Sequence, residues 1–248
     1  MTRVSELKVK IFADGADKAQ MLAMYANPLI AGFTTNPTLM RKAGVADYRA
    51  FALEVLEVIP DKPISFEVFA DEFDEMEQQA LEISSWGEHV YTKIPVTNCR
   101  REPSDEVLRR LAQAGVKVNA TALMTQRQVE RVAECLAEAP AGYVSLFAGR
   151  IADTGQDPVP HVADAVEALR RYPHLELVWA SPRELLNIFQ ADAVGCHIIT
   201  ATTDILAKLP LVGKDLDEFS LETVKMFYDD AQAAAYRLET SRTAAASH

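Results

Sequence analysis

Eight short runs rich in β-branched and aromatic residues alternate with longer amphipathic stretches along this chain of 248 residues. Each run has the length of a strand, and the stretches between them have the spacing of helices. The runs span residues 8–14, 29–35, 63–69, 89–95, 116–123, 142–149, 175–181 and 196–202. Strands that alternate with helices favour an α/β fold, because neighbouring parallel strands need a crossover connection.

Eight rounds over this chain length match the closed (β/α)8 barrel, or TIM barrel, for which about 250 residues is typical. A doubly wound open sheet is the alternative, but no GxGxxG follows any of the runs, which weakens its dinucleotide-binding form. We predict a single barrel domain over residues 1–248, with a C-terminal helical extension at 215–238 and a flexible tail at 240–248. Gly87, Gly115, Gly142 and Gly195 each precede a run, and we expect them to end helices in the left-handed conformation.

The composition restricts the classes of partner. The formal net charge is −11, which is unfavourable for a nucleic-acid-binding surface and requires locally placed Arg or Lys for any anionic substrate. No apolar run approaches the roughly 20 residues that span a bilayer, and the first residues lack the apolar core of a signal peptide. We therefore expect a cytoplasmic protein with no membrane or nucleic-acid partner.

Cysteine and histidine are too scattered to indicate a metal or disulfide site. Cys99, Cys135 and Cys196 form neither a CxxC pair nor an even-numbered framework, and we expect them to be reduced thiols. The five histidines have no zinc-ligand spacing. No metal is predicted.

Polar residues cluster at the carboxyl ends of the predicted strands, which form the working face of a barrel. Inner strand positions normally carry bulky apolar side chains, so one convergent site explains the cluster better than separate buried polar groups do. These residues are Asp14, Thr34, Thr35, Asn36, Glu67, Lys93, Asn119, Thr121, Ser145, Phe147, Arg150, Ser181 and Arg183.

Lys93 is the least expected of them, because it lies in an otherwise apolar run with no acidic residue within three positions. A buried ammonium is costly unless it is paired. Lys93 therefore either pairs with Glu67 or Asp14 across the barrel, or is neutral and able to attack a carbonyl to form a Schiff base. A buried ion pair without chemistry is the alternative.

The chain resembles the transaldolase family in its short form, related to the fructose 6-phosphate aldolases. The segments that carry the resemblance are IFADGA, GFTTNPTLM, SFEVFA, YTKIPVT, VNATALMT, VSLFAGRIADTG and WASPRELLNI, of which GFTTNP and KIPVT are the most specific. The resemblance implies a cofactor-free class I aldol mechanism that carries a dihydroxyacetone unit from a ketose phosphate to an aldose phosphate. It also implies sugar phosphates as the small-molecule partners.

The resemblance also implies roles for individual residues. Lys93 matches the Schiff-base lysine and Asp14 the general acid/base, while Glu67 and Thr121 match the pair that positions a catalytic water. The residues matched to substrate binding are Thr35 and Asn36 of the TTNP motif, Asn119, Ser145 and Phe147, with Arg150, Ser181 and Arg183 matched to the phosphate site. The seventh run reads ASPR where ASFR is more usual, so we expect Pro182 to shift Arg183.

Fructose 6-phosphate aldolases resemble this chain but carry Tyr and Gln where Phe147 and Glu67 stand here. Phe147 cannot hydrogen-bond a water near an enamine intermediate, which favours transfer to an acceptor over hydrolytic release. The three hypotheses are a transaldolase, an aldolase without an obligatory acceptor, and a catalytically silent barrel that binds sugar phosphates or serves assembly.

Short members of this family resemble ring-forming homo-oligomers in which a C-terminal helix packs on a neighbouring subunit. The extension carries Leu221, Val224, Phe227, Tyr228 and Ala231 at helical spacing. We therefore expect a homo-oligomer, from dimer to decamer. The alternative is that this helix covers its own barrel.

Overall fold

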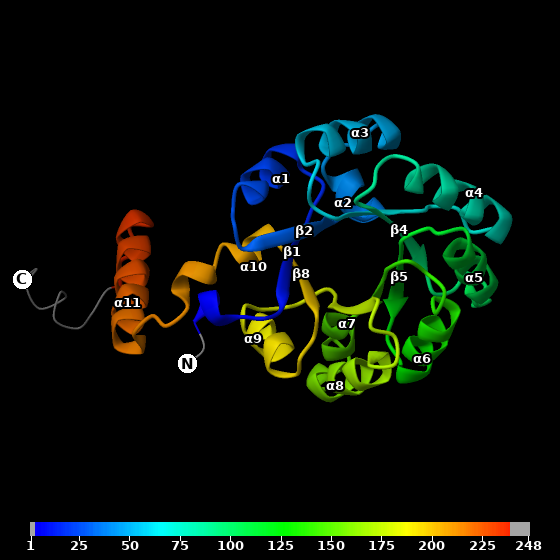
Figure 1. Cartoon of the computed structure of the whole chain (residues 1–248). Coiled ribbons are helices and arrows are strands. Elements are labelled where there is room, and N and C mark those ends of the chain that lie inside the picture. Colours follow the sequence, from blue (N-terminus) through cyan, green and yellow to red (C-terminus); the bar gives the residue numbers. More distant parts are fainter. Residues whose placement is uncertain (1–2, 239–248) are drawn as a thin grey trace, which may run out of the picture. The chain divides into compact units, whose positions relative to one another are not determined.

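Eight parallel strands close into a barrel in the computed structural model, which describes residues 3–238 (Figure 1). The strands follow one another around the ring in sequence order, and β8 pairs with β1. They are β1 (Lys10–Asp14), β2 (Ile30–Thr34), β3 (Ile64–Glu67), β4 (Val90–Pro95), β5 (Val118–Leu123), β6 (Gly142–Leu146), β7 (Leu175–Trp179) and β8 (Ile198–Thr202). The predicted (β/α)8 barrel is thus confirmed.

Helices surround the ring of strands on the outside (Figure 1). They are α1 (Lys18–Tyr25), α2 (Pro37–Lys42), α3 (Tyr48–Val58), α4 (Phe73–Ser84), α5 (Asp105–Gln113), α6 (Gln126–Cys135), α7 (Ala148–Ala152), α8 (Pro158–Leu169), α9 (Leu186–Ala193) and α10 (Thr203–Leu206). Short 3-10 turns lie at Val4–Glu6 and Leu209–Leu211. None of the helices within residues 3–238 is long and apolar enough to cross a membrane.

Several strands are shorter than the sequence pattern suggests. The run at 142–149 supplies only Gly142–Leu146 to β6, and Phe147 is instead the N-cap residue of α7. The run at 63–69 supplies only Ile64–Glu67 to β3. Apolar composition continues past these strand ends because the first turn of the next helix or loop is also buried, so periodicity alone does not mark where pairing stops.

Two of the four predicted left-handed glycines are confirmed. Gly115 and Gly195 have φ values of 78° and 73° and lie three positions before the first residues of β5 and β8. The prediction is wrong for Gly87 and Gly142, which do not have positive φ. Gly142 serves close packing instead, because a Cβ there would lie 2.8 Å from a Leu175 methyl carbon.

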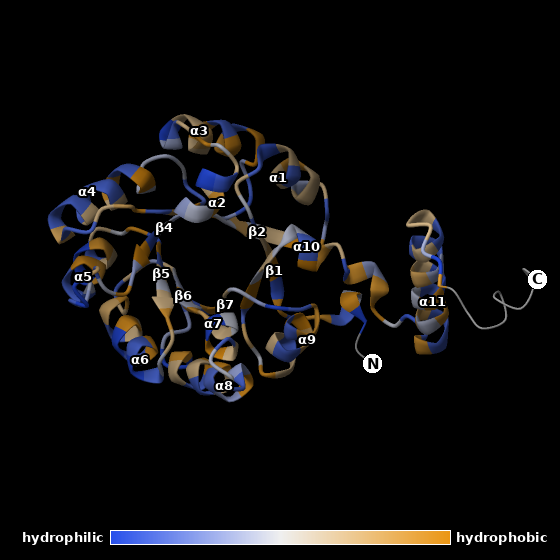
Figure 2. Ribbon diagram, turned by 180° about the vertical axis from the view of Figure 1, so that it is seen from behind, coloured by the Kyte–Doolittle hydropathy of each residue, from blue (hydrophilic) through white to orange (hydrophobic). Residues whose placement is uncertain are grey.

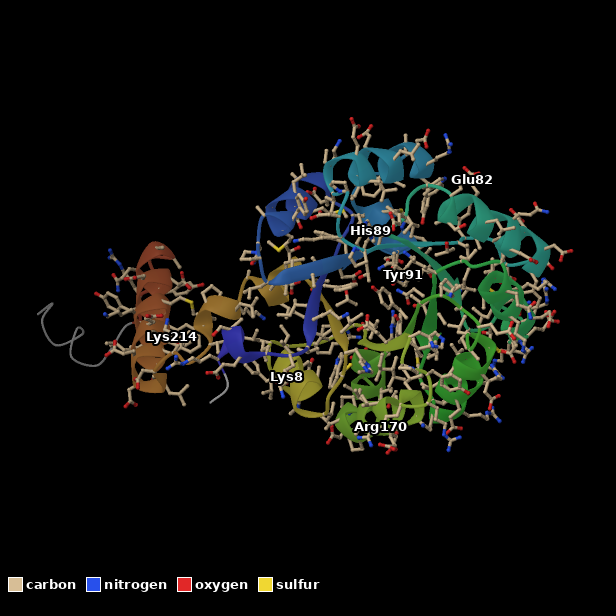
Figure 3. The ribbon with its side chains drawn as sticks, viewed as in Figure 1. Lys8, Glu82, His89, Tyr91, Arg170 and Lys214 are labelled. Atoms are coloured by element: carbon tan, nitrogen blue, oxygen red, sulfur yellow. The ribbon has the colours of Figure 1, made fainter. Side chains whose placement is uncertain are left out.

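The main core lies between the strands and the helices, and a smaller cluster fills the inside of the barrel. Figure 2 shows that the outer helices combine hydrophobic and hydrophilic residues, as expected for helices with one buried face. Inside, Tyr91 and Tyr143 stack with ring centroids 3.9 Å apart. In Figure 3, Tyr91 lies within the ring of strands, whereas Glu82 and Arg170 lie at its periphery. Tyr91 precedes Lys93 by two residues on β4, so aromatic rings fill the interior toward the amino ends of the strands.

The described residues form two compact units, which divide in the sequence between Leu209 and Pro210. The second unit contains α11 (Leu216–Ala233), a helix within the predicted extension at 215–238. Asp215 caps it by accepting from the backbone N–H groups of Asp217 and Glu218. The predicted tail at 240–248 lies outside the described residues.

Candidate active site

A cavity of about 520 Å³ opens among the carboxyl ends of the barrel strands. The predicted residues that line it are Asp14, Asn36, Glu67, Lys93, Thr121, Ser145, Phe147, Arg150 and Ser181. A barrel brings them together because they lie near the carboxyl ends of β1 to β7, which meet on the same face. Thr35, Asn119 and Arg183 were also predicted for the site but do not line the cavity.

Lys93 lies at the cavity wall and is paired with Glu67. Its Nζ atom is 3.0 Å from a Glu67 carboxylate oxygen and donates to the Thr35 backbone oxygen at 3.1 Å. Register explains the pair, because Glu67 on β3 is the direct neighbour of Lys93 on β4. Lys93 is only 6% exposed. Of the partners that the sequence allowed, Glu67 is the one observed, and Thr35 contributes its backbone rather than its hydroxyl.

Asp14 ends β1 on the other side of the cavity, and its carboxylate accepts from the Thr34 hydroxyl at 2.7 Å. The Thr34 hydroxyl also lies 2.5 Å from that of Thr200 on β8. Burial raises the pKa of Asp14, and this effect outweighs the nearby charge of Lys93, which lowers it. A raised pKa suits a carboxyl group that exchanges protons during a reaction.

Thr121 offers the cavity a buried hydroxyl with no hydrogen-bond partner among the described residues. An irregularity in the pairing of β5 with β6 lies between Ala120 and Leu123, and Ala122 has a left-handed φ of 65°. Such bulges are common beside active sites, where they redirect side chains. Because buried hydroxyls are nearly always hydrogen-bonded, Thr121 is suited to hold a water or a substrate atom.

A buried chain of hydrogen bonds supports the cavity wall beside Lys93. The Ser145 hydroxyl donates to the Asn119 side-chain oxygen at 2.7 Å, and the Asn119 amide donates to the Ser65 hydroxyl at 2.9 Å. Asn119 is the register neighbour of Lys93. The structure therefore gives Asn119 a supporting position behind Ser145, which itself lines the cavity.

The predicted phosphate residues separate into two groups. Arg150 lines the cavity, and its side chain makes no hydrogen bond or ion pair within residues 3–238. Arg183 is instead held by both carboxylate oxygens of Asp153, at 2.8 and 2.5 Å. Arg183 also donates to the backbone oxygen and the hydroxyl of Ser181. Ser181 has a left-handed φ of 61° directly before Pro182. Arg183 thus holds Ser181 in this conformation, and Ser181 and Arg150 are the residues that face the cavity.

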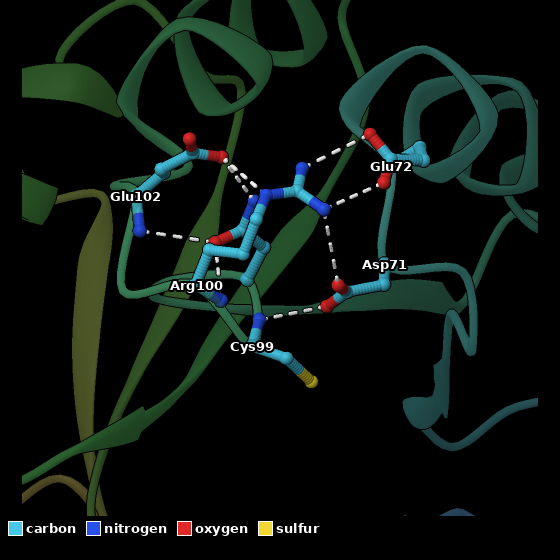
Figure 4. A network of polar contacts seen from close by, with 6 residues as sticks. Asp71, Glu72, Cys99, Arg100 and Glu102 are labelled. Atoms are coloured by element: carbon cyan, nitrogen blue, oxygen red, sulfur yellow. Dashed lines mark hydrogen bonds and ion pairs between the residues drawn. The ribbon is translucent and has the colours of Figure 1, made fainter.

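An ionic network joins the loops that follow β3 and β4 (Figure 4). Arg100 contacts both carboxylate oxygens of Glu72 at 2.7 and 3.0 Å and also pairs with Glu102, while Asp71 accepts from the Cys99 backbone N–H. These hydrogen bonds lower the pKa of Glu72 and of Asp71. The network therefore ties together the two loops that leave the strands of Glu67 and Lys93.

Three polar or charged residues line the cavity that the sequence did not predict for it: Thr38, Lys42 and Thr200. Thr34 belongs to the predicted cluster of polar strand-end residues and also lines the cavity, but the sequence predicted no individual role for it. Thr200 is a polar residue in the otherwise largely apolar eighth strand. A polar residue within an apolar run is also what singled out Lys93 in the sequence. Lys42 follows Thr38 by four residues, so both lie on one face of α2.

The three cysteines differ in their exposure to solvent. Cys99 is exposed, Cys135 and Cys196 are buried, and all three are free thiols. No group of three or more His, Cys, Asp or Glu residues within 3–238 has the geometry of a metal site.

Comparison with known proteins identifies the family. The model of the transaldolase/fructose-6-phosphate aldolase family matches residues 11–244. A probable transaldolase of Dehalococcoides mccartyi is 31% identical over 215 residues, which cover 85% of this chain and 96% of that protein. A probable transaldolase of Pelotomaculum thermopropionicum is 32% identical over 225 residues, covering 90% and 97%.

A solved structure of a putative dihydrodipicolinate synthase family protein from Coccidioides immitis has the same fold. Its TM-score is 0.54 at 12% identity, and the match covers 79% of this chain and 68% of that chain. At this identity the likeness concerns the barrel architecture alone. The extent of the family match and the identity to the transaldolases decide the assignment: this chain belongs to the transaldolase/fructose-6-phosphate aldolase family.

Proposed function

We propose that this protein is a transaldolase that moves a dihydroxyacetone unit from a ketose phosphate to an aldose phosphate through a Schiff base on Lys93. The observation that carries the proposal is the buried Lys93–Glu67 pair, because it faces a cavity instead of being sealed in the core. An ion pair with a purely structural role needs no cavity beside it. Family membership favours the same chemistry.

The reaction begins with attack of the neutral Lys93 amine on the C2 carbonyl of the ketose. For this the ammonium must lose a proton, and we assign Glu67, whose carboxylate oxygen is 3.0 Å away, as the group that accepts it. The resulting carbinolamine loses water to give a protonated imine. Glu67 and the partnerless Thr121 hydroxyl are the two cavity groups that we assign to that water.

Cleavage then requires a base at the C4 hydroxyl. Asp14 takes that proton, the C3–C4 bond breaks, and its electron pair moves into the imine to form an enamine on Lys93. The aldose phosphate produced by cleavage leaves. An acceptor aldose phosphate reverses these steps, and water finally hydrolyses the new imine to release the product ketose.

The fate of the enamine decides between transfer and release. Phe147 lines the cavity and offers no hydrogen bond to a water that could protonate the enamine. The intermediate is thereby kept for an acceptor aldehyde. We assign the sugar phosphate group to Arg150 and Ser181, with Arg183 as the residue that positions Ser181.

Borohydride trapping tests the Schiff base. The protein is incubated with fructose 6-phosphate and borohydride, and then analysed by intact mass and peptide mapping. We expect an adduct of dihydroxyacetone size on Lys93, and no adduct on the Lys93→Met variant. An unmodified Lys93 in folded protein, across a panel of ketose phosphates, would contradict the proposal.

A second assay separates transfer from release. Glyceraldehyde 3-phosphate formation from fructose 6-phosphate is measured with and without erythrose 4-phosphate, and we expect it to depend strongly on the acceptor. Equal rates would identify an aldolase without an obligatory acceptor. If no product forms and no sugar phosphate raises the Tm, the protein is a catalytically silent barrel.

A further inference from the structure

Two threonine hydroxyls that the proposed reaction does not use lie in a row with the Asp14 carboxylate. Thr34 on β2 donates to a carboxylate oxygen of Asp14 at 2.7 Å, and its hydroxyl oxygen lies 2.5 Å from that of Thr200 on β8. All three residues line the cavity. Thr34 and Thr200 are only 2% and 6% exposed, so the protein supplies most of their hydrogen-bond partners.

The order of the strands brings these three groups together. β1 lies between β2 and β8, and Asp14 is the direct register neighbour of Thr34. Two residues earlier on the same strands, the Phe12 ring takes the place of a side chain at Gly32, where a Cβ would lie 2.6 Å from a ring atom. Residues two apart on a strand share a face, so an apolar layer lies beneath the polar row, toward the amino ends of the strands.

The number of hydroxyl hydrogens fixes the direction of this row when Asp14 is ionised. An ionised carboxylate only accepts, so the single hydrogen of the Thr34 hydroxyl points to Asp14. The contact between the two threonines must then use the hydrogen of Thr200. Thr200 thus donates to Thr34 and Thr34 donates to Asp14. A hydroxyl that accepts a hydrogen bond is itself a stronger donor, so Thr200 strengthens the bond to the carboxylate.

Hydroxyl partners suit a carboxyl group that alternates between its charged and neutral forms. A backbone N–H can only donate, and would lose its partner when the bonded oxygen took up a proton. A hydroxyl can both donate and accept. When Asp14 takes up the C4 proton on that oxygen, the row can reverse, with Asp14 donating to Thr34 and Thr34 donating to Thr200. Neither protonation state then leaves a group of the row unpaired.

We propose that Thr200 is a positioning residue for Asp14, whose hydroxyl orients that of Thr34 toward the carboxylate and strengthens the hydrogen bond between them. This inference rests on the proposed function, in which Asp14 is the base that removes the C4 proton. Thr200 acts on the reaction through Thr34. The row holds the carboxylate ionised and in place until cleavage, and accommodates its proton afterwards.

The charges around Asp14 are unchanged by substitutions of the two threonines. Burial is the largest effect and raises the pKa of Asp14, while the charge of Lys93 and the hydrogen bond from Thr34 lower it. The charge of Glu67 raises this pKa. Further charged groups on the surrounding elements and the cavity wall are Asp17, Asp204 of α10, Lys42 and Arg150. A changed titration of Asp14 in the threonine variants therefore reports on the hydroxyl groups.

The titration of Asp14 tests the inference on the resting protein, without substrate. Carbon-13 NMR follows the carboxyl group as the pH is changed, and the signal is assigned by its absence in Asp14→Asn. We expect Thr34→Val to raise the pKa by about one unit, because a hydrogen bond to a charged group is roughly twice as strong as one to a neutral group. Thr200→Val should raise it by about 0.3 to 0.5 unit, because the bond from Thr34 is then weaker. Thr200→Ser keeps the hydroxyl and should keep the wild-type value.

A double variant distinguishes a connected row from two separate effects. If Thr200 acts through Thr34, the pKa of Asp14 in the double variant Thr34→Val with Thr200→Val should equal that in Thr34→Val alone. Additive shifts would mean that Thr200 acts on Asp14 directly. An unchanged titration in Thr200→Val would mean that it does not act on Asp14 at all. Either result would overturn the inference.

Thr202→Val is the matched control on the same strand. Thr202 is the register neighbour of Asp14 on β8, but its hydroxyl is bonded to Asp204 instead of joining the row. The variant loses the same hydroxyl and should leave the pKa of Asp14 unchanged. A rise equal to that in Thr200→Val would show that any added methyl group nearby has the effect, which would also overturn the inference.

Activity separates this inference from the proposed function. The acidic limb of the pH profile of kcat/KM for fructose 6-phosphate should move upward with the pKa of Asp14 in each variant, because that limb reports the base of the free enzyme. Turnover and trapping on Lys93, with an unchanged Asp14 titration in Thr200→Val, would mean that this inference fails alone. The expected NMR shifts without turnover or trapping would mean that the proposed function fails alone.

Discussion

The carboxyl group of Asp14 is buried, and burial disfavours its charged form. We therefore expect the ionised Asp14 to lower the free energy of unfolding. Its pKa in the folded protein lies above the ordinary value of 3.8. The stability that this group contributes is therefore fully present below pH 3.8 and is lost as the pH rises through the folded-state pKa. At neutral pH the charged carboxylate destabilises the fold.

We therefore predict that Asp14→Asn raises the Tm at pH 7, with a gain that shrinks as the pH is lowered toward 4. The asparagine oxygen can still accept from Thr34, so the neighbouring hydrogen bond is kept. Turnover should fall by about two to four orders of magnitude, the usual effect of removing a general acid/base. Thermal melts measure the change in Tm, and kinetic assays measure the loss of turnover. Glu138→Gln is the control, because Glu138 is exposed and its neutralisation should change neither. A Tm at pH 7 that falls or stays constant would contradict the prediction.

Phe147 should control the fate of the enamine. We predict that Phe147→Tyr raises cleavage without an acceptor by about five- to ten-fold, because a single new hydrogen bond to water is worth about 1 kcal/mol. The rate of glyceraldehyde 3-phosphate release without erythrose 4-phosphate measures it. Phe69→Tyr adds the same hydroxyl to an exposed ring outside the cavity and should have no effect. If the two variants behave alike, the cavity ring does not exclude water.

At the scale of elements, α7 and the segment after β7 depend on one close approach. A Cβ on Gly149 would lie 1.5 Å from the Ser181 backbone oxygen. Neither segment can move freely, because Arg183 ties Ser181 to Asp153 beyond the end of α7. The glycine thus allows α7, which carries Arg150, to approach the segment that carries Ser181 at the cavity.

We predict that Gly149→Ala lowers the free energy of unfolding by about 3 kcal/mol, the upper range for a steric clash in a packed core. It should also raise KM for phosphorylated sugars, because Ser181 must shift. Gly87→Ala is the matched control, since a Cβ there makes only ordinary van der Waals contacts, with a Val90 methyl at 3.6 Å and the Leu56 methyls at 3.9 Å. Urea unfolding of both variants gives the comparison. Equal stability of the two proteins would show that the loops adapt freely.

The order and type of the elements were predictable from sequence, because hydrophobic periodicity reports directly on strands and helices. Most residues that line the candidate site were predictable for a related reason. Lys93, Glu67 and Asp14 are polar residues at strand ends, and a barrel brings all strand ends to one face. The predicted barrel topology was therefore enough to predict that these three residues lie close together.

Side-chain pairing could not be predicted in the same way. Arg183 is bonded to Asp153, 30 residues away, and does not line the cavity. Lys42 lines the cavity only because of the direction in which α2 leaves β2. Neither fact leaves a signal in local composition, since both depend on how two segments meet in space.

At the scale of the whole molecule, α11 bears on assembly. No residue of α11 is buried, and Val224, Phe227 and Tyr228 are 60%, 63% and 63% exposed. A row of large apolar side chains on one helix is typical of an interaction surface. The expectation of a homo-oligomer, from dimer to decamer, stays a prediction.

Light scattering at micromolar concentration should therefore give a mass of at least a dimer. Phe227→Glu should lower that mass, because it places a charge within the apolar row. Gln232→Glu adds the same charge at another exposed position of α11 and should leave the mass unchanged. A monomeric wild type would contradict the prediction.

Lys42 and Arg150 are two cations that line the cavity, and the side chain of neither forms an ion pair among residues 3–238, which has a kinetic consequence. At a distance, a sugar phosphate meets the field of a protein with a net charge of −11, which slows diffusional encounter. Within about one Debye length, roughly 8 Å at physiological ionic strength, it meets Lys42 and Arg150 instead. Added salt screens the distant repulsion before it weakens the contacts with these two cations. The association rate of a sugar phosphate should therefore rise as salt is first added. The attractive cations act only at short range, whereas the net charge that salt screens first is repulsive.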